Sequence, residues 1–209
     1  MQYALVIGAG HTTGDSGPNE SGSLAQALPG GPLKTPLAEP VQPPVTSITL
    51  VTDNFGGGTG RHVLEMLRFR DLDQWPTTVL CYGVDDGLTP GPTIPYQRRR
   101  FRKRLVRFPL PQGMALRDLA GQLPAGPSVL HTYFFWPIMY GRLLKILGKV
   151  EHLVENREDV GFKLGPVHLW LLRRTTEAPD LVICVSEAVR RATIDNEGLS
   201  PEKVVVVPN

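Results

Sequence analysis

Residues 48–70 read ITLVTDNFGGGTGRHVLEMLRFR, and the rest of the chain repeats the pattern that they begin. Ile48–Thr52 is a short run of apolar and β-branched residues, which is typical of a strand. The glycine-rich turn Gly56–Gly60 follows it. From Arg61 to Arg70 the apolar residues recur on one face with the period of a helix. The stretch therefore predicts a strand, a turn and a helix whose first N–H groups can approach an anion such as a phosphate.

The same alternation of apolar runs and helical periods continues along the chain as far as residue 207. Predicted strands cover residues 48–52, 77–82, 105–108, 128–132, 151–155, 181–186 and 204–207, and predicted helices cover 61–70, 115–123, 136–147, 164–177 and 187–197. The strands are continuous apolar runs, which is typical of a parallel sheet covered on both faces. We therefore expect an α/β fold with a doubly wound, mostly parallel sheet of about seven strands.

Residues 1–47 differ in composition from the rest of the chain. Gly, Pro, Ser, Thr and Ala predominate there, and large apolar side chains are scarce. Such a segment cannot bury enough apolar surface to offset the entropy that ordering costs. We predict a disordered or irregular tail over residues 1–47 and one domain over residues 48–209.

A dinucleotide-binding motif begins, but does not continue, inside this tail. Val6–Gly10 matches the first part of the pattern GxGxxG, but the third glycine would fall at Thr13. Residues 15–22 are turn-like, whereas the motif requires a helix at that place. A nicotinamide-dependent enzyme built on Gly8 and Gly10 is therefore the weakest of the functional hypotheses.

Charge and composition exclude several classes of protein. The net charge is +2, which is too small to indicate nucleic-acid binding by itself. No apolar run reaches the ~20 residues of a membrane-spanning helix, and no secretory signal is recognisable, so a cytoplasmic protein is the default expectation. Cys81 and Cys184 each lie in an apolar strand-like run, which predicts two buried thiols without a disulfide. No spacing of His, Cys, Asp or Glu predicts a metal site.

Four segments follow the ends of predicted strands. They are the glycine-rich turn, His131–Tyr133, Glu155–Arg157 and Ser186–Glu187. In parallel sheets, ligands bind beyond the carboxyl ends of the strands, where the order of the strands switches. We therefore expect these four segments at one edge of the sheet, and we expect the functional site there.

Four motifs, taken in order, resemble a known family. They are GGTGRHVLE at residues 57–65, VLHTY at 129–133, DLVICVSEAVR at 180–190 and the run from Gly198 to Asn209. Together they resemble the N-terminal domain of a GT-B-fold, family 4-type retaining glycosyltransferase over roughly residues 48–209. The resemblance implies a Rossmann-like domain and transfer of a sugar from a nucleotide-sugar donor to a hydroxyl acceptor with retention. It implies no metal and no other cofactor.

The second domain of such enzymes holds most of the donor and carries a pair of glutamates. This chain has no counterpart of that pair, because Pro208-Asn209 stands where the second domain begins in the family. We therefore expect the acceptor-side half of a cleft, a missing C-terminal partner domain and an isolated chain without activity. The alternative is a non-catalytic module that binds a nucleotide, a phospho-sugar or a partner.

The resemblance assigns the donor phosphates to Gly57, Gly58, Gly60 and Arg61. The three glycines would contact the phosphates through backbone N–H groups, and the guanidinium of Arg61 would add a positive charge. A tight turn that requires positive φ is the alternative explanation of the glycines. A solvated side chain is the alternative for Arg61.

His131 and Glu155 are the candidate catalytic residues. His131 lies where the family has its histidine segment, so we expect it to contact the transferred sugar or the acceptor hydroxyl, or to tune charge near physiological pH. A hydrogen-bonded structural histidine is the alternative. Glu155 would be an acceptor-binding carboxylate or part of a solvated charged loop. Its match is partial, because the family often has a His or an Asp-like group in this loop.

Tyr133, Asn156, Ser186 and Glu187 complete the predicted cleft on the acceptor side. Each of them follows or ends a predicted strand. Ser186 also stands directly before a predicted helix, where a serine is typical of an N-cap. The two roles of Ser186 are compatible.

The basic run Arg98–Arg107 has three interpretations. It can be a solvated loop face, a surface attracted to anionic lipid headgroups, or a nucleic-acid contact. Phe101, Leu105 and Phe108 interleave apolar groups with the charges, which favours lipid over nucleic acid. On the lipid interpretation the protein is peripheral at the inner membrane face. No recognised motif supports a nucleic-acid partner.

Overall fold

A computed structural model describes residues 47–82, 90–91, 94–98, 109–161 and 164–208. All the described residues belong to the unit Pro43–Asn209. The predicted tail over residues 1–47 therefore lies outside the described residues, apart from Ser47. Residues 99–108 also lie outside them, so the interpretations of the basic run stay predictions.

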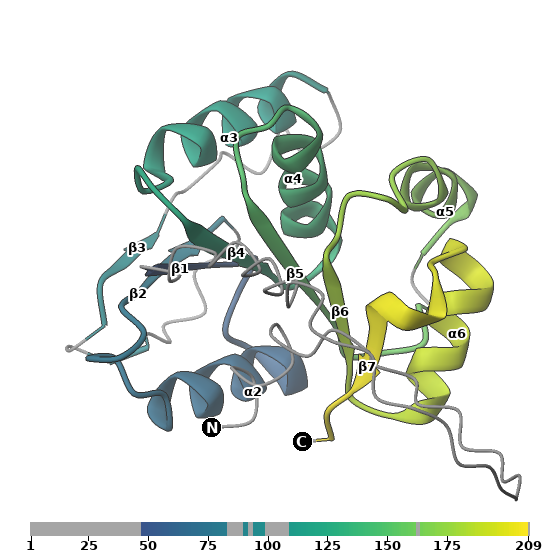
Figure 1. Cartoon of the computed structure of the whole chain (residues 1–209), viewed down its shortest axis with the longest axis horizontal. Helices are drawn as coiled ribbons and strands as arrows, with labels where there is room; N and C mark the ends of the chain where they lie inside the picture. Colours follow the sequence, from purple (N-terminus) through teal and green to yellow (C-terminus); the bar gives the residue numbers. More distant parts are fainter. Residues whose placement is uncertain (1–46, 83–89, 92–93, 99–108, 162–163, 209) are drawn as a thin grey trace, which may run out of the picture. The chain divides into compact units, whose positions relative to one another are not determined.

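The described residues form one parallel sheet with helices on both faces (Figure 1). Its strands are β1 (Ser47–Thr52), β2 (Thr77–Cys81), β3 (Tyr96–Arg98), β4 (Ser128–Thr132), β5 (His152–Arg157), β6 (Leu181–Cys184) and β7 (Val204–Val206). The helices are α2 (Gly57–Arg68), α3 (Pro109–Gln122), α4 (Phe135–Ile146), α5 (Pro166–Arg173), α6 (Glu187–Glu197) and the short 3₁₀ turn η2 (Pro201–Lys203). The sheet has seven strands in the order β3-β2-β1-β4-β5-β6-β7, and every neighbouring pair is parallel. The predicted fold class is confirmed.

Several elements differ from the sequence-based expectation; α3, for example, begins at Pro109 rather than at residue 115. The edge strand is Tyr96–Arg98, in a stretch without a strand pattern, whereas the predicted strand over residues 105–108 lies outside the described residues. Backbone pairing defines β3, because Val79 N–H donates to the Pro95 carbonyl at 2.8 Å and Val79 pairs with Tyr96. Helix α2 also begins at Gly57 rather than at Arg61, so most of the predicted glycine turn is the first turn of the helix.

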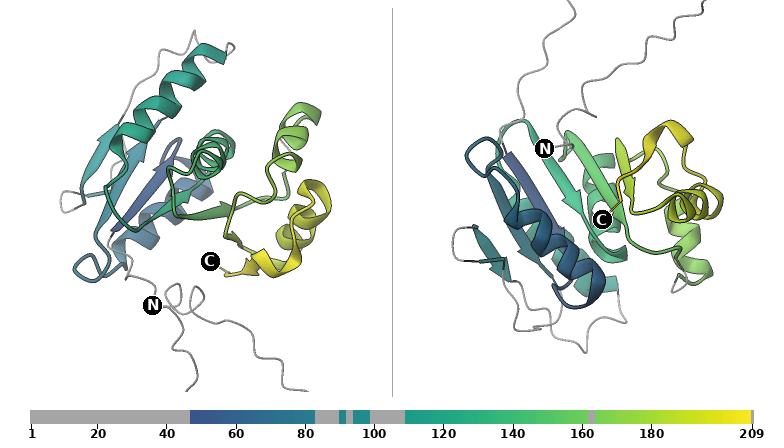
Figure 2. Two further views of the ribbon diagram at one scale, coloured as in Figure 1. Left: turned by 45° about the horizontal axis from the view of Figure 1, so that its top comes forward. Right: turned by 90° about the horizontal axis from the view of Figure 1, so that it is seen from below.

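The core lies on both faces of the sheet, because successive residues of a strand point to opposite sides. On β1, Leu50 packs with Val63 and Leu67 of α2. The next residue, Val51, packs with Leu119 of α3 and Leu144 of α4. Figure 1 shows the same arrangement, with α2 below the sheet and α3 and α4 above it, and Figure 2 shows α2 in front of the strands when the sheet is viewed from below.

A buried network of four charged side chains joins α4, β5 and α6. The Arg142 guanidinium donates to Glu155 from Nε at 2.8 Å and from Nη2 at 2.9 Å. Arg157 donates to Glu155 from Nη2 at 2.9 Å and to Glu197 from Nε at 2.7 Å. Arg142 Nη2 closes the network by donating to Glu197 at 3.1 Å. The two positive and two negative charges compensate one another inside the fold.

The network also determines how Glu197 titrates. Burial by itself would raise the pKa of Glu197, but Arg157 and Arg142 together hold it below the ordinary value. A carboxyl group with a depressed pKa stabilises the folded state above its unfolded pKa, and this stabilisation is lost as pH falls through the folded pKa. Glu197 therefore contributes to folding at neutral pH as an ionised partner of both arginines.

Replacing Glu197 should destabilise the fold strongly. Glu197→Ala leaves Arg157 and Arg142 buried with one carboxylate fewer, and removing one partner of a buried ion pair costs about 3–5 kcal/mol. Urea unfolding followed by circular dichroism measures the loss. The matched control is Glu177→Ala, because Glu177 pairs with Lys203 at 3.0 Å on the surface, where ion pairs contribute little. Equal stabilities of the two variants would contradict this view of the network.

Candidate functional site

The order of the strands switches between β1 and β4. Helix α2 connects β1 to β2 on one face of the sheet. Helix α4 connects β4 to β5 on the other face. The carboxyl ends of β1 and β4 therefore border the crevice where α/β proteins bind ligands. Tyr133 N–H donates to the Val51 carbonyl at 2.9 Å, which holds the two strand ends together. Residues on both sides have positive φ, namely Gly57 at 71° and Phe134 at 68°.

The N-terminus of α2 follows the carboxyl end of β1 at this switch point. Gly56 is its N-cap and offers no side-chain hydrogen bond, and the first turn contains no acidic residue. The first N–H groups of a helix have no partner within the helix, and they concentrate partial positive charge at that end. The turn can therefore bind an anion through its backbone.

The three predicted phosphate-binding glycines have different structural roles. A Cβ on Gly60 would lie 2.0 Å from the Phe55 carbonyl carbon, so packing requires glycine there. Gly57 has positive φ, so its backbone favours glycine. A Cβ on Gly58 would meet nothing within 4 Å, and its φ is ordinary. The fold itself therefore does not require glycine at position 58. The missing side chain leaves the first turn of α2 open to solvent. The phosphate contact stays a prediction.

A row of polar side chains runs from β4 across β5 to α2. His131 Nε2 lies 3.0 Å from Asn156 Oδ1, and Asn156 Nδ2 donates to Glu158 Oε1 at 2.9 Å. His62 of α2 ends the row, with its Nε2 3.9 Å from Glu158 Oε1. The ring of Tyr133 lies beside both histidines, with centroid distances of 4.8 Å to His131 and 6.4 Å to His62. The structure thus brings together three predicted site residues, His131, Asn156 and Tyr133.

His131 is a neutral imidazole at neutral pH. Burial lowers its pKa to about 3, although the hydrogen bond to Asn156 acts in the opposite direction. The suggestion that His131 tunes charge near physiological pH is therefore wrong. A neutral ring can still donate one hydrogen bond and accept another. Contact with a sugar or acceptor hydroxyl stays a prediction.

Glu155 does not join His131 at the site. It is fully buried on the opposite face of β5 from Asn156, because neighbouring residues of a strand alternate. Arg142 binds both of its carboxylate oxygens, and Arg157 binds one of them as well. The solvated-loop alternative for Glu155 is wrong. A catalytic or acceptor-binding role has not been tested, and this geometry gives it no support.

The remaining predicted residues lie at the expected edge with structural roles of their own. Ser186 accepts a hydrogen bond from Val189 N–H at 3.3 Å, which confirms it as the N-cap of α6. Glu187 pairs with Arg190 at 3.3 Å and with Arg191 at 3.5 Å on the exposed side of that helix. Arg61 is exposed at the first turns of α2. Their contacts with a ligand stay predictions.

Asp53 is a titratable residue at this end of the sheet that the sequence reasoning missed. It follows β1 directly, and burial raises the pKa of its carboxyl group to about 7. Its carbonyl accepts a hydrogen bond from Cys81 Sγ at 3.3 Å, which fixes its backbone at the end of the strand. The sequence does show a carboxylate directly after an apolar strand. It does not show how deeply the side chain is buried, and the raised pKa depends on that burial.

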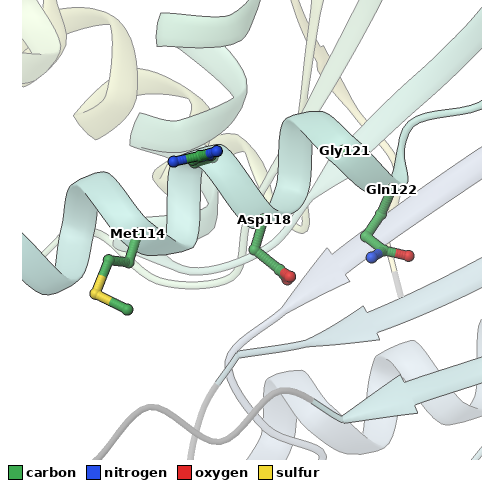
Figure 3. Close-up of a pocket in the computed structure, with 5 residues that line it drawn as sticks. Met114, Asp118, Gly121 and Gln122 are labelled. Carbon is green, nitrogen blue, oxygen red and sulfur yellow. The ribbon is translucent and has the colours of Figure 1, made fainter.

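The described residues also have surface depressions on α3 and between α2 and residues Pro90, Gly91 and Ile94. A depression of about 350 Å³ runs along α3 (Figure 3), and all its lining residues, Met114, Arg117, Asp118, Gly121 and Gln122, come from that helix. Cys81 and Cys184 are buried and form no disulfide, as predicted. Among the described residues, no group of three His, Cys, Asp or Glu could hold a metal, and none of the described helices is long and apolar enough to cross a membrane.

Comparisons with known proteins show the family of this chain and several similar folds. The model of Glycosyltransferase Family 4 matches residues 56–209. The structure of HepE from Anabaena in complex with UDP is similar, with a TM-score of 0.59 and 16% identity over 78% of this chain and 44% of HepE. A UDP-N-acetylglucosamine 2-epimerase from Rickettsia bellii has a TM-score of 0.55 and 11% identity over 79% of this chain and 45% of that one.

A third similar structure is a glycosyltransferase from Rickettsia africae, with a TM-score of 0.54 and 14% identity over 79% of this chain and 43% of that one. At these identities the likeness shows the fold alone. This chain spans less than half the length of each of the three proteins. A comparison with curated protein sequences found no match.

Alanine at Gly60 and at Gly58 should have opposite effects on stability. Gly60→Ala drives a methyl group into the Phe55 backbone and should cost more than about 2 kcal/mol, because the backbone must shift. Gly58→Ala meets open space within α2, and alanine favours a helix by up to about 1 kcal/mol over glycine. Thermal unfolding of both variants checks this. A loss of stability in Gly58→Ala would show that the fold does require that glycine.

Asp53 should make the fold less stable as pH rises. Its folded pKa of about 7 lies above the ordinary 3.8, so the folded state binds the proton more tightly than the unfolded state. Stability should therefore fall between these two pH values. Asp53→Asn should be more stable than the wild type at pH 8 and equal to it near pH 4. The expected gain at pH 8 is about 1–3 kcal/mol, because solvent that reaches the partly exposed side chain reduces the effect of burial.

Urea unfolding at three pH values measures this effect, with Asp73→Asn in an exposed turn as the control. A pH-independent difference between Asp53→Asn and the wild type would refute the raised pKa.

Proposed function

Because this chain belongs to glycosyltransferase family 4, we propose that it forms one Rossmann-like half of a GT-B enzyme that transfers a sugar from a nucleotide sugar to a hydroxyl acceptor. One observation carries the proposal. An uncapped helix N-terminus and a neutral histidine border the same switch point of the sheet. The first can bind a phosphate, and the second can hydrogen-bond a hydroxyl group of the sugar or of the acceptor.

The donor phosphates are assigned to the first turn of α2. Its N–H groups have no side-chain cap, and Gly58 leaves them uncovered. Arg61, exposed nearby, adds a positive charge. HepE, which has a similar fold, was solved with UDP bound. UDP and UDP-sugars are therefore the first ligands to test.

Transfer with retention fits the chemistry of this edge. The bond from the anomeric carbon to the donor phosphate breaks, and a bond to the acceptor oxygen forms on the same face. The proton of the acceptor hydroxyl passes to the departing phosphate. Such a reaction needs positive groups that stabilise the departing phosphate more than it needs a protein nucleophile. This fits a site that offers N–H groups and a neutral imidazole, whereas the buried Glu155 carboxylate is paired with arginines on the other face of β5.

We propose further that a second domain supplies the other wall of the cleft. The described residues present a single sheet edge, and the chain spans 44% of the length of HepE. On this view the 209 residues bind a nucleotide weakly and do not turn it over by themselves. The basic run Arg98–Arg107 remains a candidate contact for an anionic membrane surface that carries the acceptor.

A non-catalytic binding module is the second candidate. The observation that favours it is Glu155, the predicted acceptor carboxylate, whose two oxygens are both paired with arginines. Such a module would hold a nucleotide or a phospho-sugar at the same edge without transfer. The two candidates differ in turnover once a second domain is supplied, and not in binding.

Gly58→Asp should weaken nucleotide binding without harming the fold. A carboxylate at the start of α2 stabilises the helix but repels a phosphate at the same place. In protein-detected NMR titrations of the 209-residue chain, we expect saturable UDP binding that weakens at least tenfold, or about 1.4 kcal/mol, in this variant. Gln74→Asp, which adds the same charge in an exposed turn, is the control. Binding that is unchanged by Gly58→Asp, or absent from the wild type, would overturn the phosphate site.

The activity of the chain is tested separately. With UDP-glucose and a hydroxyl acceptor, the 209 residues alone should release no UDP. Measurable turnover would refute the proposal that a second domain is required. After a second domain is added, the anomeric configuration of the product, read by NMR, decides between retention and inversion, and a complete lack of transfer favours the binding module.

A further inference from the structure

Two hydrogen bonds in series connect Glu158 to His131. Glu158 Oε1 accepts from Asn156 Nδ2 at 2.9 Å, and Asn156 Oδ1 lies 3.0 Å from His131 Nε2. Asn156 and His131 are buried, and Glu158 is nearly so, with 11% of its side chain exposed. Three side chains from β4, β5 and the loop after β5 therefore form one row with little access for water.

The chemistry of these groups determines the direction of both hydrogen bonds. A carboxylate only accepts, so the atom of Asn156 that faces Glu158 must be its NH₂ group. The opposite atom of the same amide is then the oxygen, which also only accepts. The hydrogen between Asn156 and His131 must therefore belong to Nε2 of His131.

His62 favours this direction as well. Its Nε2 lies 3.9 Å from Glu158 Oε1 and has no hydrogen bond to any of the described groups. An N–H on this nitrogen of His62 would point to the Glu158 carboxylate. His62 therefore also favours Glu158 as an ionised acceptor. The reverse arrangement would need a protonated Glu158 and a flipped Asn156 amide.

A neutral imidazole carries one N–H only. Burial keeps His131 neutral, because it lowers the pKa to about 3. With the hydrogen on Nε2, the other nitrogen, Nδ1, has a lone pair and no hydrogen. In the described part of the chain, no hydrogen bond reaches Nδ1. The ring belongs to the last residues of β4, beside Tyr133 at the switch point.

We propose that Glu158 and Asn156 are positioning residues that fix His131 as the Nε2–H tautomer and so present a bare Nδ1 to the ligand. Nδ1 then accepts a hydrogen bond from a hydroxyl group and offers nothing to a phosphate. The site divides accordingly: the α2 N-terminus takes the anion, and His131 takes a carbohydrate hydroxyl. The identity of the hydroxyl rests on the proposed function, whereas the tautomer does not.

The tautomer can be measured without any ligand. In the 209-residue chain labelled with ¹⁵N-histidine, long-range ¹H–¹⁵N correlation spectra distinguish a protonated ring nitrogen from a bare one. His131→Gln identifies the His131 signals by their loss. At pH 7 we expect one species, with a protonated Nε2 and a bare Nδ1. A protonated Nδ1, a mixture of tautomers or a doubly protonated ring would overturn the proposal.

Glu158→Gln tests the origin of this preference. A glutamine amide can face Asn156 with either its oxygen or its NH₂ group, so Asn156 can flip and the Nδ1–H tautomer should become detectable. Asp159→Asn makes the same change of charge at the next residue and should leave His131 as in the wild type. If Glu158→Gln is folded and retains a single Nε2–H species, Glu158 is not the positioning residue. If it does not fold, the wild-type spectrum still decides the tautomer.

This result is independent of the proposed function. A chain with the Nε2–H tautomer that never binds UDP would refute the phosphate site and leave the row from Glu158 to His131 standing. A chain that binds UDP with a hydrogen on Nδ1 of His131 would refute the row alone.

Discussion

A buried network of charges around Glu155 fixes three elements of the fold against one another. Arg142, Arg157 and Glu197 converge on it from α4, β5 and α6, so three elements distant in sequence are joined by charge. Buried charges are tolerated only when they are paired and hydrogen-bonded. The three elements must therefore keep their relative positions, and β5 is held firmly beside β4 and β6.

The same strand carries the site on its other side. Glu155 and Arg157 point to the network, whereas Asn156, between them, points to His131. This division follows from the period of two along a strand. The charged pairs that hold β5 in place thereby also hold the hydrogen-bonded row that ends on His131. Stability and the geometry of the site are linked through one strand.

Much of this could be predicted from the sequence, and the physical reasons are local. Continuous apolar runs such as Ile48–Thr52 indicate buried parallel strands, and the family resemblance places Gly57–Gly60 and His131 at the site. Charge partners could not be predicted, because Arg142 lies 13 residues from Glu155 and 55 residues from Glu197 and meets both only after folding. For the same reason the sequence does not show that arginines pair with both oxygens of Glu155, or that burial raises the pKa of Asp53.

The strand–turn–helix at residues 48–70 was determined by sequence alone, since apolar period and glycine placement act between near neighbours. The tertiary structure decided which of its glycines are required: Gly60 lies against the Phe55 backbone, and Gly58 faces open space. It also decided that α2 begins within the glycine turn and that His131 is neutral and bound to Asn156. These properties depend on close contact, burial and partners from other strands, which a linear pattern does not contain.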